Sequence, residues 1–308
     1  MKTLITGATG FLGTHLNKRL LKNGEEVVGI GSRDCDLTQQ GALERKFGDD
    51  KFNQIFHLAA WTQAGDFCLH HPGEQWIINQ QINTNVLNWW KNSQPKAKMI
   101  SMGTSCSYDS TLELKEENYL KGKPIESLFT YAQTKRMLFT GLMAFQKQFD
   151  MDYLHFVPST LYGPGYHTDG RQMHFIFDLM RKILSAKENG SQVTLWGDGN
   201  QKRELVHVED FIDAMLDINK NHKNDILNIG AGEGHSIKDF AEMICEIVKY
   251  DSSKIKYDTS KYVGAKSKIV DVSKMRSMYQ GNFRDIREGI SETIDWMKDN
   301  KEKIYAKK

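Results

Sequence analysis

The chain has 308 residues, of which 39% are hydrophobic and 26% charged, with a formal net charge of +2. These values predict a soluble globular protein with one large α/β domain and a smaller lobe, and they give no reason to expect a nucleic-acid or membrane partner. No stretch approaches the roughly 18 apolar residues of a membrane span. Four scattered cysteines without a CxxC pair indicate a reducing compartment, so we expect a cytoplasmic protein.

Short β runs alternate with helical patterns through the first half of the chain. The strands are short and continuously apolar, which is typical of strands covered on both faces. This alternation predicts an α/β fold: a Rossmann doubly wound parallel sheet with a smaller C-terminal α/β substrate lobe. The expected strands span residues 2–6, 27–30, 54–60, 99–103 and 153–158, and the expected helices span residues 11–23, 38–47, 77–92 and 130–149.

The pattern changes after the segment 162–165, which reads Tyr-Gly-Pro-Gly. A polar loop and a helix lead to a strand at 193–196, and a later β run at 226–229 is expected to rejoin the first sheet. Ser236 and Asp239 have the spacing of a helix capping box. We therefore expect a cofactor domain from residues 1–163 plus about 206–230, and a second lobe from 164–205 and 231–308.

A glycine-rich loop follows the first expected strand and opens the first expected helix. It reads Gly7-Ala8-Thr9-Gly10-Phe11-Leu12-Gly13. Glycines allow a tight turn and a close approach of the backbone to a pyrophosphate, and the helix N-terminus offers free N–H groups. The strand–loop–helix setting predicts a dinucleotide-binding site.

The end of the second expected strand should contact the ribose 2′ position of that dinucleotide. No acidic residue stands at the strand tip, and Arg33 offers a planar fork suited to a 2′-phosphate. NADP is therefore favoured over NAD, although Asp34 keeps NAD open. Asp36 and Leu37 are expected beside the adenine. The remaining expected cofactor contacts are Leu58, Ala59, Ala60, Pro158, Ser159, Thr160 and Leu161.

Three residues further along the chain predict proton transfer at a carbonyl. Tyr131 and Lys135 are four residues apart and share one face of a helix. Lowering the pKa of a phenol from about 10 to about 7 takes roughly 4 kcal/mol, which Lys135 and an oxidised nicotinamide would supply together. Lys135 would also hold the nicotinamide ribose. Thr104, at a strand end, would donate a hydrogen bond to the substrate oxygen.

These motifs extend along nearly the whole chain and include Trp196-Gly197-Asp198-Gly199 and the segment 203–210. In them the sequence resembles the nucleotide-sugar branch of the extended short-chain dehydrogenase/reductase family. The resemblance implies a Rossmann domain for the cofactor and a C-terminal lobe for a nucleoside-diphosphate sugar, with hydride exchange at sugar C4. It also implies a homodimer formed through two long helices, here expected at 77–92 and 130–149.

Within that branch the sequence is most similar to the GDP-L-fucose synthases, which are 3,5-epimerases and 4-reductases. The similarity rests on segment 32–37, on Gly103-Thr104-Ser105-Cys106-Ser107-Tyr108 and on a histidine after Tyr162-Gly163-Pro164. It implies that Cys106 and His174 move protons at C3 and C5 of a GDP-linked 4-keto sugar, with NADPH as cofactor. The substrate contacts that it implies are Thr104, Lys182, Trp196, Arg203 and Lys268.

Other interpretations remain open. Cys106 and His174 are also compatible with ordinary packing roles. The segments 61–75 and 167–172 depart from the family pattern, so the sequence does not identify the sugar of the substrate. The alternative is a GDP-mannose 3,5-epimerase-like enzyme or a 4-epimerase that recycles its cofactor. A 4,6-dehydratase and a non-catalytic cofactor-sensing protein are less favoured. Cys68, His70 and His71 alone are too few ligands for a metal, so none is expected.

Overall fold

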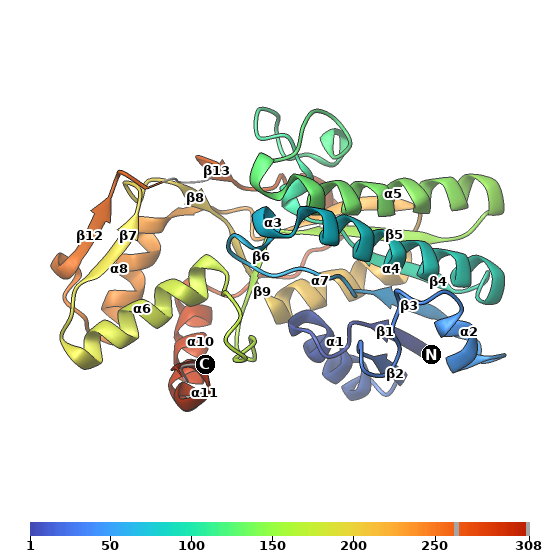
Figure 1. The fold of residues 1–308 in the computed structure, drawn as a ribbon, viewed down its shortest axis with the longest axis horizontal. Helices are drawn as coiled ribbons and strands as arrows, with labels where there is room; N and C mark the ends of the chain where they lie inside the picture. The colour runs from blue at the N-terminus through green and yellow to red at the C-terminus, as the bar shows by residue number, and fades with distance from the viewer. Residues whose placement is uncertain (262–264, 306–308) are drawn as a thin grey trace.

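Six short strands form one parallel sheet in the computed structural model of the chain, which describes residues 1–261 and 265–305 (Figure 1). They are β1 (Lys2–Thr6), β2 (Glu26–Ile30), β3 (Gln54–His57), β4 (Lys98–Met102), β5 (Tyr153–Pro158) and β10 (Asp225–Ile229). Their order is β2-β1-β3-β4-β5-β10, so the direction of winding reverses between β1 and β3. In doubly wound sheets ligands bind outside the carboxyl ends of the strands at this point. The glycine loop after β1 lies there.

Helices cover both faces of this sheet. They are α1 (Phe11–Lys22), α2 (Ala42–Phe47), α4 (Pro72–Ser93), α5 (Phe129–Phe149), α7 (Val208–Asn221) and α9 (Ser273–Met278). Successive strand residues point to opposite faces. Leu4 and Ile55 therefore belong to a core shared with α2, α4 and α5, whereas Ile5 and Phe56 belong to a core shared with α1, α7 and α9. The predicted Rossmann architecture is confirmed.

A third buried cluster holds the smaller half of the molecule together. It contains residues of α6 (Phe175–Asn189), α8 (Ile237–Val248), α10 (Ile286–Asp299) and β7 (Val193–Trp196). Small sheets surround it: β7 pairs with β12 (Ile255–Asp258), and β8 (Lys202–Arg203) lies between β11 (His235–Ser236) and β13 (Ser267–Lys268). The remaining elements are β6 (Thr160–Tyr162) paired with β9 (Leu205–His207), α3 (Phe67–His70), α11 (Lys301–Tyr305), and the 3-10 helices η1 (Ser105–Ser107), η2 (Glu116–Asn118), η3 (Glu126–Leu128) and η4 (Ser252–Lys254).

Most predicted elements are confirmed, including the strands at 2–6 and 153–158 and the capping box of Ser236 and Asp239. The predicted helix over 38–47 is wrong in its first part, because α2 begins only at Ala42. The carboxylate of Asp36 accepts the Thr38 N–H at 3.0 Å and forms a turn there, and Gly41 has a φ of +75°. The helix predicted at 77–92 begins earlier, at Pro72, since proline is well suited to the first helical turn.

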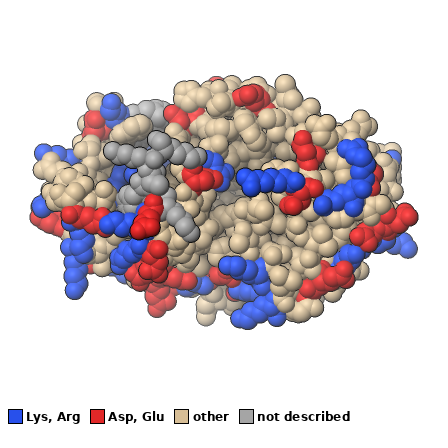
Figure 2. Space-filling view, turned by 60° about the horizontal axis from the view of Figure 1, so that its bottom comes forward, with Lys and Arg blue, Asp and Glu red and all other residues tan. Residues whose placement is uncertain are grey.

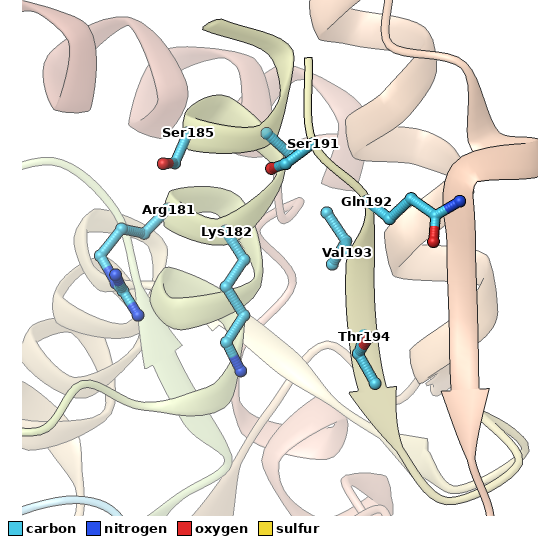
Figure 3. A pocket seen from close by; sticks show the side chains of 8 residues that line it. Arg181, Lys182, Ser185, Ser191, Gln192, Val193 and Thr194 are labelled. Atoms are coloured by element: carbon cyan, nitrogen blue, oxygen red, sulfur yellow. The ribbon is translucent and has the colours of Figure 1, made fainter. Parts of the chain in front are cut away.

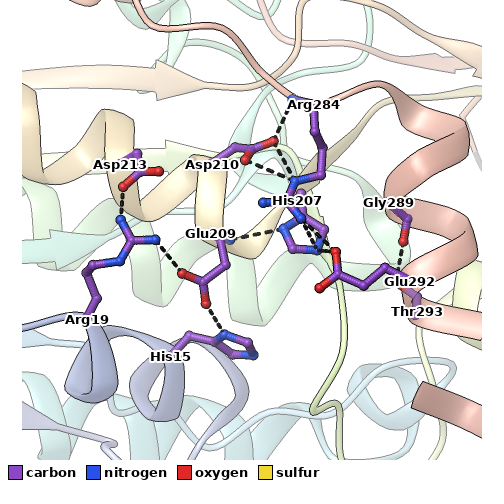
Figure 4. Close-up of polar contacts among 10 residues, drawn as sticks. All are labelled: His15, Arg19, His207, Glu209, Asp210, Asp213, Arg284, Gly289, Glu292 and Thr293. Atoms are coloured by element: carbon purple, nitrogen blue, oxygen red, sulfur yellow. Dashed lines mark hydrogen bonds and ion pairs between the residues drawn. The ribbon is translucent and has the colours of Figure 1, made fainter. Parts of the chain in front are cut away.

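A polar network joins the first helix to the segments that lead into the smaller half (Figure 4). His15 on α1 contacts the Pro164 carbonyl at 2.8 Å and also bonds to Glu209 on α7. Arg19 donates to Glu209 at 2.7 Å. On the other side of α7, Arg284 forms an ion pair with Asp210 at 3.1 Å. Charged groups from both halves are thus fixed at the beginning of α7.

The surface carries charges of both signs. Figure 2 shows Lys and Arg side chains interspersed with Asp and Glu over the face that it presents. Within residues 1–261 and 265–305, no helix combines the length and the apolar character that a membrane crossing requires.

Candidate active site

The glycine loop is shaped by close backbone contacts. Gly7 has a φ of +71°, and a Cβ there would lie 2.8 Å from the Ala59 nitrogen. A Cβ on Gly13 would lie 2.2 Å from the Gly7 carbonyl oxygen. Gly10 precedes α1, and no side chain caps its N-terminus. The N–H groups of Phe11 and the residues after it are therefore available to an anion such as a pyrophosphate.

The other predicted cofactor residues lie around this loop at the strand ends. Thr9 lies against Gly31, where a Cβ would be 2.9 Å from its side chain. The segment 58–60 follows β3, and the Ala59 N–H donates to the Thr6 hydroxyl at 3.3 Å. Residues 158–161 span the end of β5 and the start of β6. These positions fit a dinucleotide stretched across the switch point.

The segment after β2 contains two carboxylates that are already engaged. Asp34 accepts the Gly31 N–H at 2.8 Å. Asp36 accepts both the N–H and the hydroxyl of Thr38, and these bonds lower its pKa. The Arg33 side chain is exposed between them. The Arg33 guanidinium is therefore accessible to a ligand, whereas the carboxylates of Asp34 and Asp36 are engaged by backbone N–H groups.

Thr104, Tyr131 and Lys135, here called the tyrosine group, come from the end of β4 and the first turns of α5. Thr104 precedes η1, and its hydroxyl accepts the Cys106 N–H at 3.2 Å. The Lys135 ammonium lies 5.8 Å from the centre of the Tyr131 ring. Lys135 is buried, and burial lowers its pKa to about 8. The i, i+4 spacing thus produces the predicted pairing.

Burial dominates the electrostatics of the tyrosine group. It raises the pKa of Tyr131, and Cys106 and Cys68 raise it further. Burial, followed by the charge of Lys135, lowers the pKa of His57 to about 4. Tyr131 is therefore protonated in the free protein, and the buried ammonium of Lys135 lies where its charge can favour a phenolate.

Arg136 fixes the two parts of the tyrosine group to each other. Its buried guanidinium donates to the Ser107 carbonyl at 2.9 and 2.5 Å. It also donates to the carbonyls of Gly122 and Lys121 at 2.9 and 2.7 Å. One side chain on α5 thereby holds the loop that carries Thr104 and Cys106, because its planar fork satisfies several carbonyls at once.

Cys106, His174, Arg203 and Lys268, here called the thiol group, come from distant segments. The Lys268 Nζ lies 2.7 Å from the Cys106 Sγ. Lys268 pairs with Arg203 in the register of β13 and β8, and the field of Cys106 opposes the effect of burial on the pKa of Arg203. The family resemblance implies that Lys268 contacts the substrate, and the structure places its ammonium at the Cys106 thiol.

His174 directly precedes α6 instead of lying within a helix. The residue is exposed to solvent. Desolvation by neighbouring protein atoms, followed by the charges of Lys268 and His167, lowers its pKa. His174 is therefore neutral at pH 7 and able to accept a proton.

The remaining predicted substrate residues lie further along α6 and on β7. Lys182 forms an ion pair with Asp178 at 2.8 Å and lines a hollow of about 240 Å³ with Thr194 and other polar residues (Figure 3). Trp196 ends β7 with 63% of its surface exposed. Asp178 and Lys182 lie one turn apart on α6, four and eight residues after His174.

Cys68, which the sequence offers only as one of too few ligands for a metal, lies close to the tyrosine group. The Cys68 thiol is buried, accepts a hydrogen bond from the Gln75 side chain at 3.1 Å and influences the pKa of Tyr131. The only signal in the sequence was that segment 61–75 departs from the family pattern. Its spacing from Tyr131 along the chain gave no indication that the thiol would influence that residue.

The two segments that depart from the family pattern contact each other. The Asp66 N–H donates to the Gln172 side-chain oxygen at 3.0 Å. Within the first segment, Trp61 and Phe67 have ring centres 4.8 Å apart. Asn79 on α4 both donates to and accepts from the Trp61 backbone, at 3.0 and 2.9 Å. These segments form one joined structure beside Cys68.

Comparison with known proteins agrees with this fold. The model of the NAD dependent epimerase/dehydratase family matches residues 3–230. GDP-L-fucose synthase 1 of Arabidopsis thaliana is 28% identical, over 96% of this chain and 92% of its own. GDP-L-colitose synthase of Yersinia pseudotuberculosis is 27% identical, over 98% of this chain and 99% of its own. A GDP-L-fucose synthetase structure from Naegleria fowleri superimposes with a TM-score of 0.85 at 24% identity, covering 98% of this chain and 94% of that chain.

The fold and the site therefore define an NAD(P)-dependent enzyme with a nucleotide loop and a Tyr–Lys pair. The chain belongs to the NAD dependent epimerase/dehydratase family. Within it, the chain falls among the nucleotide-sugar epimerases and reductases, with GDP-sugar enzymes among its relatives.

Proposed function

We propose that the protein is an NADPH-dependent 3,5-epimerase and 4-reductase of a GDP-4-keto (6-deoxy)hexose or a related sugar. The observation that carries the proposal is the 2.7 Å contact between Cys106 and Lys268, because it adds a thiol and an ammonium to an otherwise ordinary reductase site. The names of the full-length relatives support the GDP-sugar class. Exposed Arg33, with Asp34 turned to the backbone, supports NADP over NAD.

Substrate binding would use the cations outside the tyrosine group. Lys182 and Arg203 are suited to a diphosphate, since charge-assisted hydrogen bonds to anions are strong. The exposed ring of Trp196 is suited to stacking on a base. In this arrangement residues 1–163 and about 206–230 hold the cofactor, and residues 164–205 and 231–308 hold the nucleotide sugar.

Proton transfer at carbon would use the thiol group. A C4 ketone makes the hydrogens on C3 and C5 removable, because the electron pair of the broken C–H bond moves to the carbonyl oxygen. The Cys106 thiolate takes the proton on one face. His174, neutral in the free protein, takes up a proton from solvent beside the anionic substrate and returns it on the other face. Thr104 and Tyr131 donate hydrogen bonds to the enolate oxygen and stabilise its charge.

Reduction would follow at C4. NADPH, when bound, supplies the hydride. Tyr131 donates its phenolic proton to the C4 oxygen, and the Lys135 ammonium stabilises the resulting phenolate. The residues after β1 and β3 would hold the dinucleotide.

The test is deuterium exchange on GDP-4-keto sugars in deuterated water, with and without NADPH. We expect deuterium at C3 or C5 without NADPH, and stoichiometric NADPH oxidation when it is added. Exchange without net NADPH consumption would instead identify an epimerase that recycles its cofactor. The proposal is wrong if the purified protein binds NADPH but neither exchanges nor reduces any GDP-4-keto sugar.

We also propose a cytoplasmic homodimer that assembles through α4 and α5. These helices pack side by side on one face of the sheet (Figure 1). Ile77 and Met137 leave 57% and 48% of their surfaces exposed on them. Light scattering during size exclusion should give twice the chain mass, and replacing both residues with Glu should give the monomer. A monomeric wild-type protein would contradict this assembly.

A further inference from the structure

Glu204 is a buried carboxylate that binds two separate backbone segments. It lies between β8 and β9 and is 1% exposed. One oxygen, Oε1, accepts the Gly232 N–H at 2.7 Å, and the other, Oε2, accepts the Val270 N–H at 2.9 Å. A Cβ on Gly230 would lie 2.2 Å from Oε1. The carboxylate therefore fills a site that leaves room for its two oxygens and little else.

This carboxylate is held by backbone groups. Burial raises its pKa to about 7, while the N–H groups of Val270, Gly232 and Ala231 act in the opposite direction. A buried carboxylate that lost one of these donors would carry an uncompensated desolvation cost. Its geometry and charge thus depend on residues 231–232 and 270 staying in place, and they depend on it.

The neighbouring arginine holds the other end of the same segment. The Arg203 guanidinium donates to the Ala265 carbonyl at 2.8 Å, and Arg203 pairs with Lys268 in the strand register. Arg203 and Glu204 therefore fix residues 265 and 270, on either side of Lys268. A lysine side chain has several freely rotating bonds, so the position of its backbone decides whether its ammonium reaches a given atom.

We propose that Glu204 is a positioning residue that fixes the strand of Lys268 so that its ammonium meets the Cys106 sulfur. This inference rests on the proposed function, because it assigns Glu204 a role in keeping Cys106 ready to accept a carbon-bound proton. The ammonium donates to the sulfur at 2.7 Å, and the thiolate is the form of a cysteine that accepts protons and attacks electrophiles. Glu204 acts through Lys268 and does not contact the substrate.

The test measures thiolate reactivity directly and needs no sugar. Iodoacetamide alkylates a thiolate by forming an S–C bond as iodide leaves, and mass spectrometry of the Cys106 peptide gives its rate from pH 6 to 9. E204Q keeps the size of the side chain but presents an NH₂ group to one of the two N–H donors. We expect Cys106 alkylation at pH 7 to slow about tenfold in E204Q and in K268M. E242Q, the same change at an exposed glutamate on α8, should match the wild type.

Two comparisons decide the outcome. The E204Q/K268M double variant should be no slower than K268M alone, because both changes remove the same contact. E204D, which keeps both oxygens, should recover part of the rate, and it replaces E204Q in the series if E204Q does not fold. An unchanged pH–rate profile in E204Q, or full additivity with K268M, overturns the proposal. If the wild-type protein turns over no GDP-4-keto sugar but the alkylation rates differ as expected, the proposed function is wrong and the positioning role of Glu204 stands.

Discussion

The tyrosine group and the thiol group meet in one site, but they are built differently. Thr104, Tyr131 and Lys135 come from adjacent elements of the large sheet, and Arg136 ties those elements together with four hydrogen bonds. Cys106 shares that loop, whereas Lys268 reaches it from a two-residue strand 162 positions later. The tyrosine group is thus held by local contacts, whereas the contact of Cys106 with Lys268 depends on how the two halves of the molecule fit.

The largest effect should come from Y131F, which removes the proton donor and leaves the ring. We expect kcat for NADPH oxidation to fall about 10³-fold, since a positioned acid contributes 10²–10⁴-fold. Absorbance at 340 nm gives the rate. Tyr108, whose hydroxyl donates to Asn228 at 2.6 Å, provides the matched control. Y108F should keep kcat within about threefold, since it removes a single structural hydrogen bond.

R136M should release the loop that carries both Thr104 and Cys106, because Arg136 holds this loop with its hydrogen bonds. It leaves the carbonyls of Ser107, Lys121 and Gly122 without their donor, so we expect the free energy of unfolding to fall by about 3 kcal/mol. Urea denaturation measures this loss. R136K keeps the charge but not the planar fork and should recover only part of the stability. A loss below about 1 kcal/mol in R136M would show that the loop is held by other contacts.

C106S should distinguish the roles of the two groups, because it should slow proton exchange at carbon and leave reduction intact. We expect deuterium exchange at C3 and C5 to slow about 100-fold, because a serine hydroxyl is a far weaker base near neutral pH. NADPH-dependent reduction of a ketone that needs no epimerisation should remain within about threefold of wild type, because the tyrosine group is intact. C68S is the matched control, as both thiols are buried near Tyr131. Equal loss of exchange in C68S and C106S would remove the special role given to Cys106.

Acid should weaken the large-sheet half through His57. Burial, then Lys135, lowers its folded-state pKa to about 4. Because that value lies below the unfolded one, about 6.5, this contribution to stability is complete above pH 6.5 and is lost as the pH falls toward 4. Between pH 7.5 and 5 the loss should be about 2 kcal/mol. Urea midpoints of H57Q should therefore vary less with pH than those of wild type, and parallel curves would contradict the assignment.

The smallest effect should come from Q172A, which removes the acceptor of the Asp66 N–H. Both residues are exposed, so stability should change by less than about 1 kcal/mol. The KM for the nucleotide sugar should rise a few-fold while kcat holds, because the joined segments position substrate and leave the reacting groups untouched. Isothermal titration with a GDP-sugar checks the same change in binding. A fall in kcat at constant KM would show that Gln172 acts on the chemistry.

The sequence predicts the local features of this molecule well. The glycine loop, the Tyr131–Lys135 spacing and the Ser236 capping box depend on residues a few positions apart, so their patterns are enough to place them. Lys268 and Cys68 could not be placed at Cys106 and Tyr131 in the same way. Strand β13 has two residues and no periodicity to detect, and Cys68 follows a loop whose path is set by Asn79.

The contact between Asp66 and Gln172 also bears on how this enzyme could change its substrate. The two segments both depart from the family pattern and touch each other, although about 100 residues separate them along the chain. Exchanging one segment for that of a relative would leave the other with a mismatched neighbour. Redesign of the sugar site should therefore transplant both segments as a pair, with Gly65 retained, because a Cβ there would overlap the Gln172 side chain.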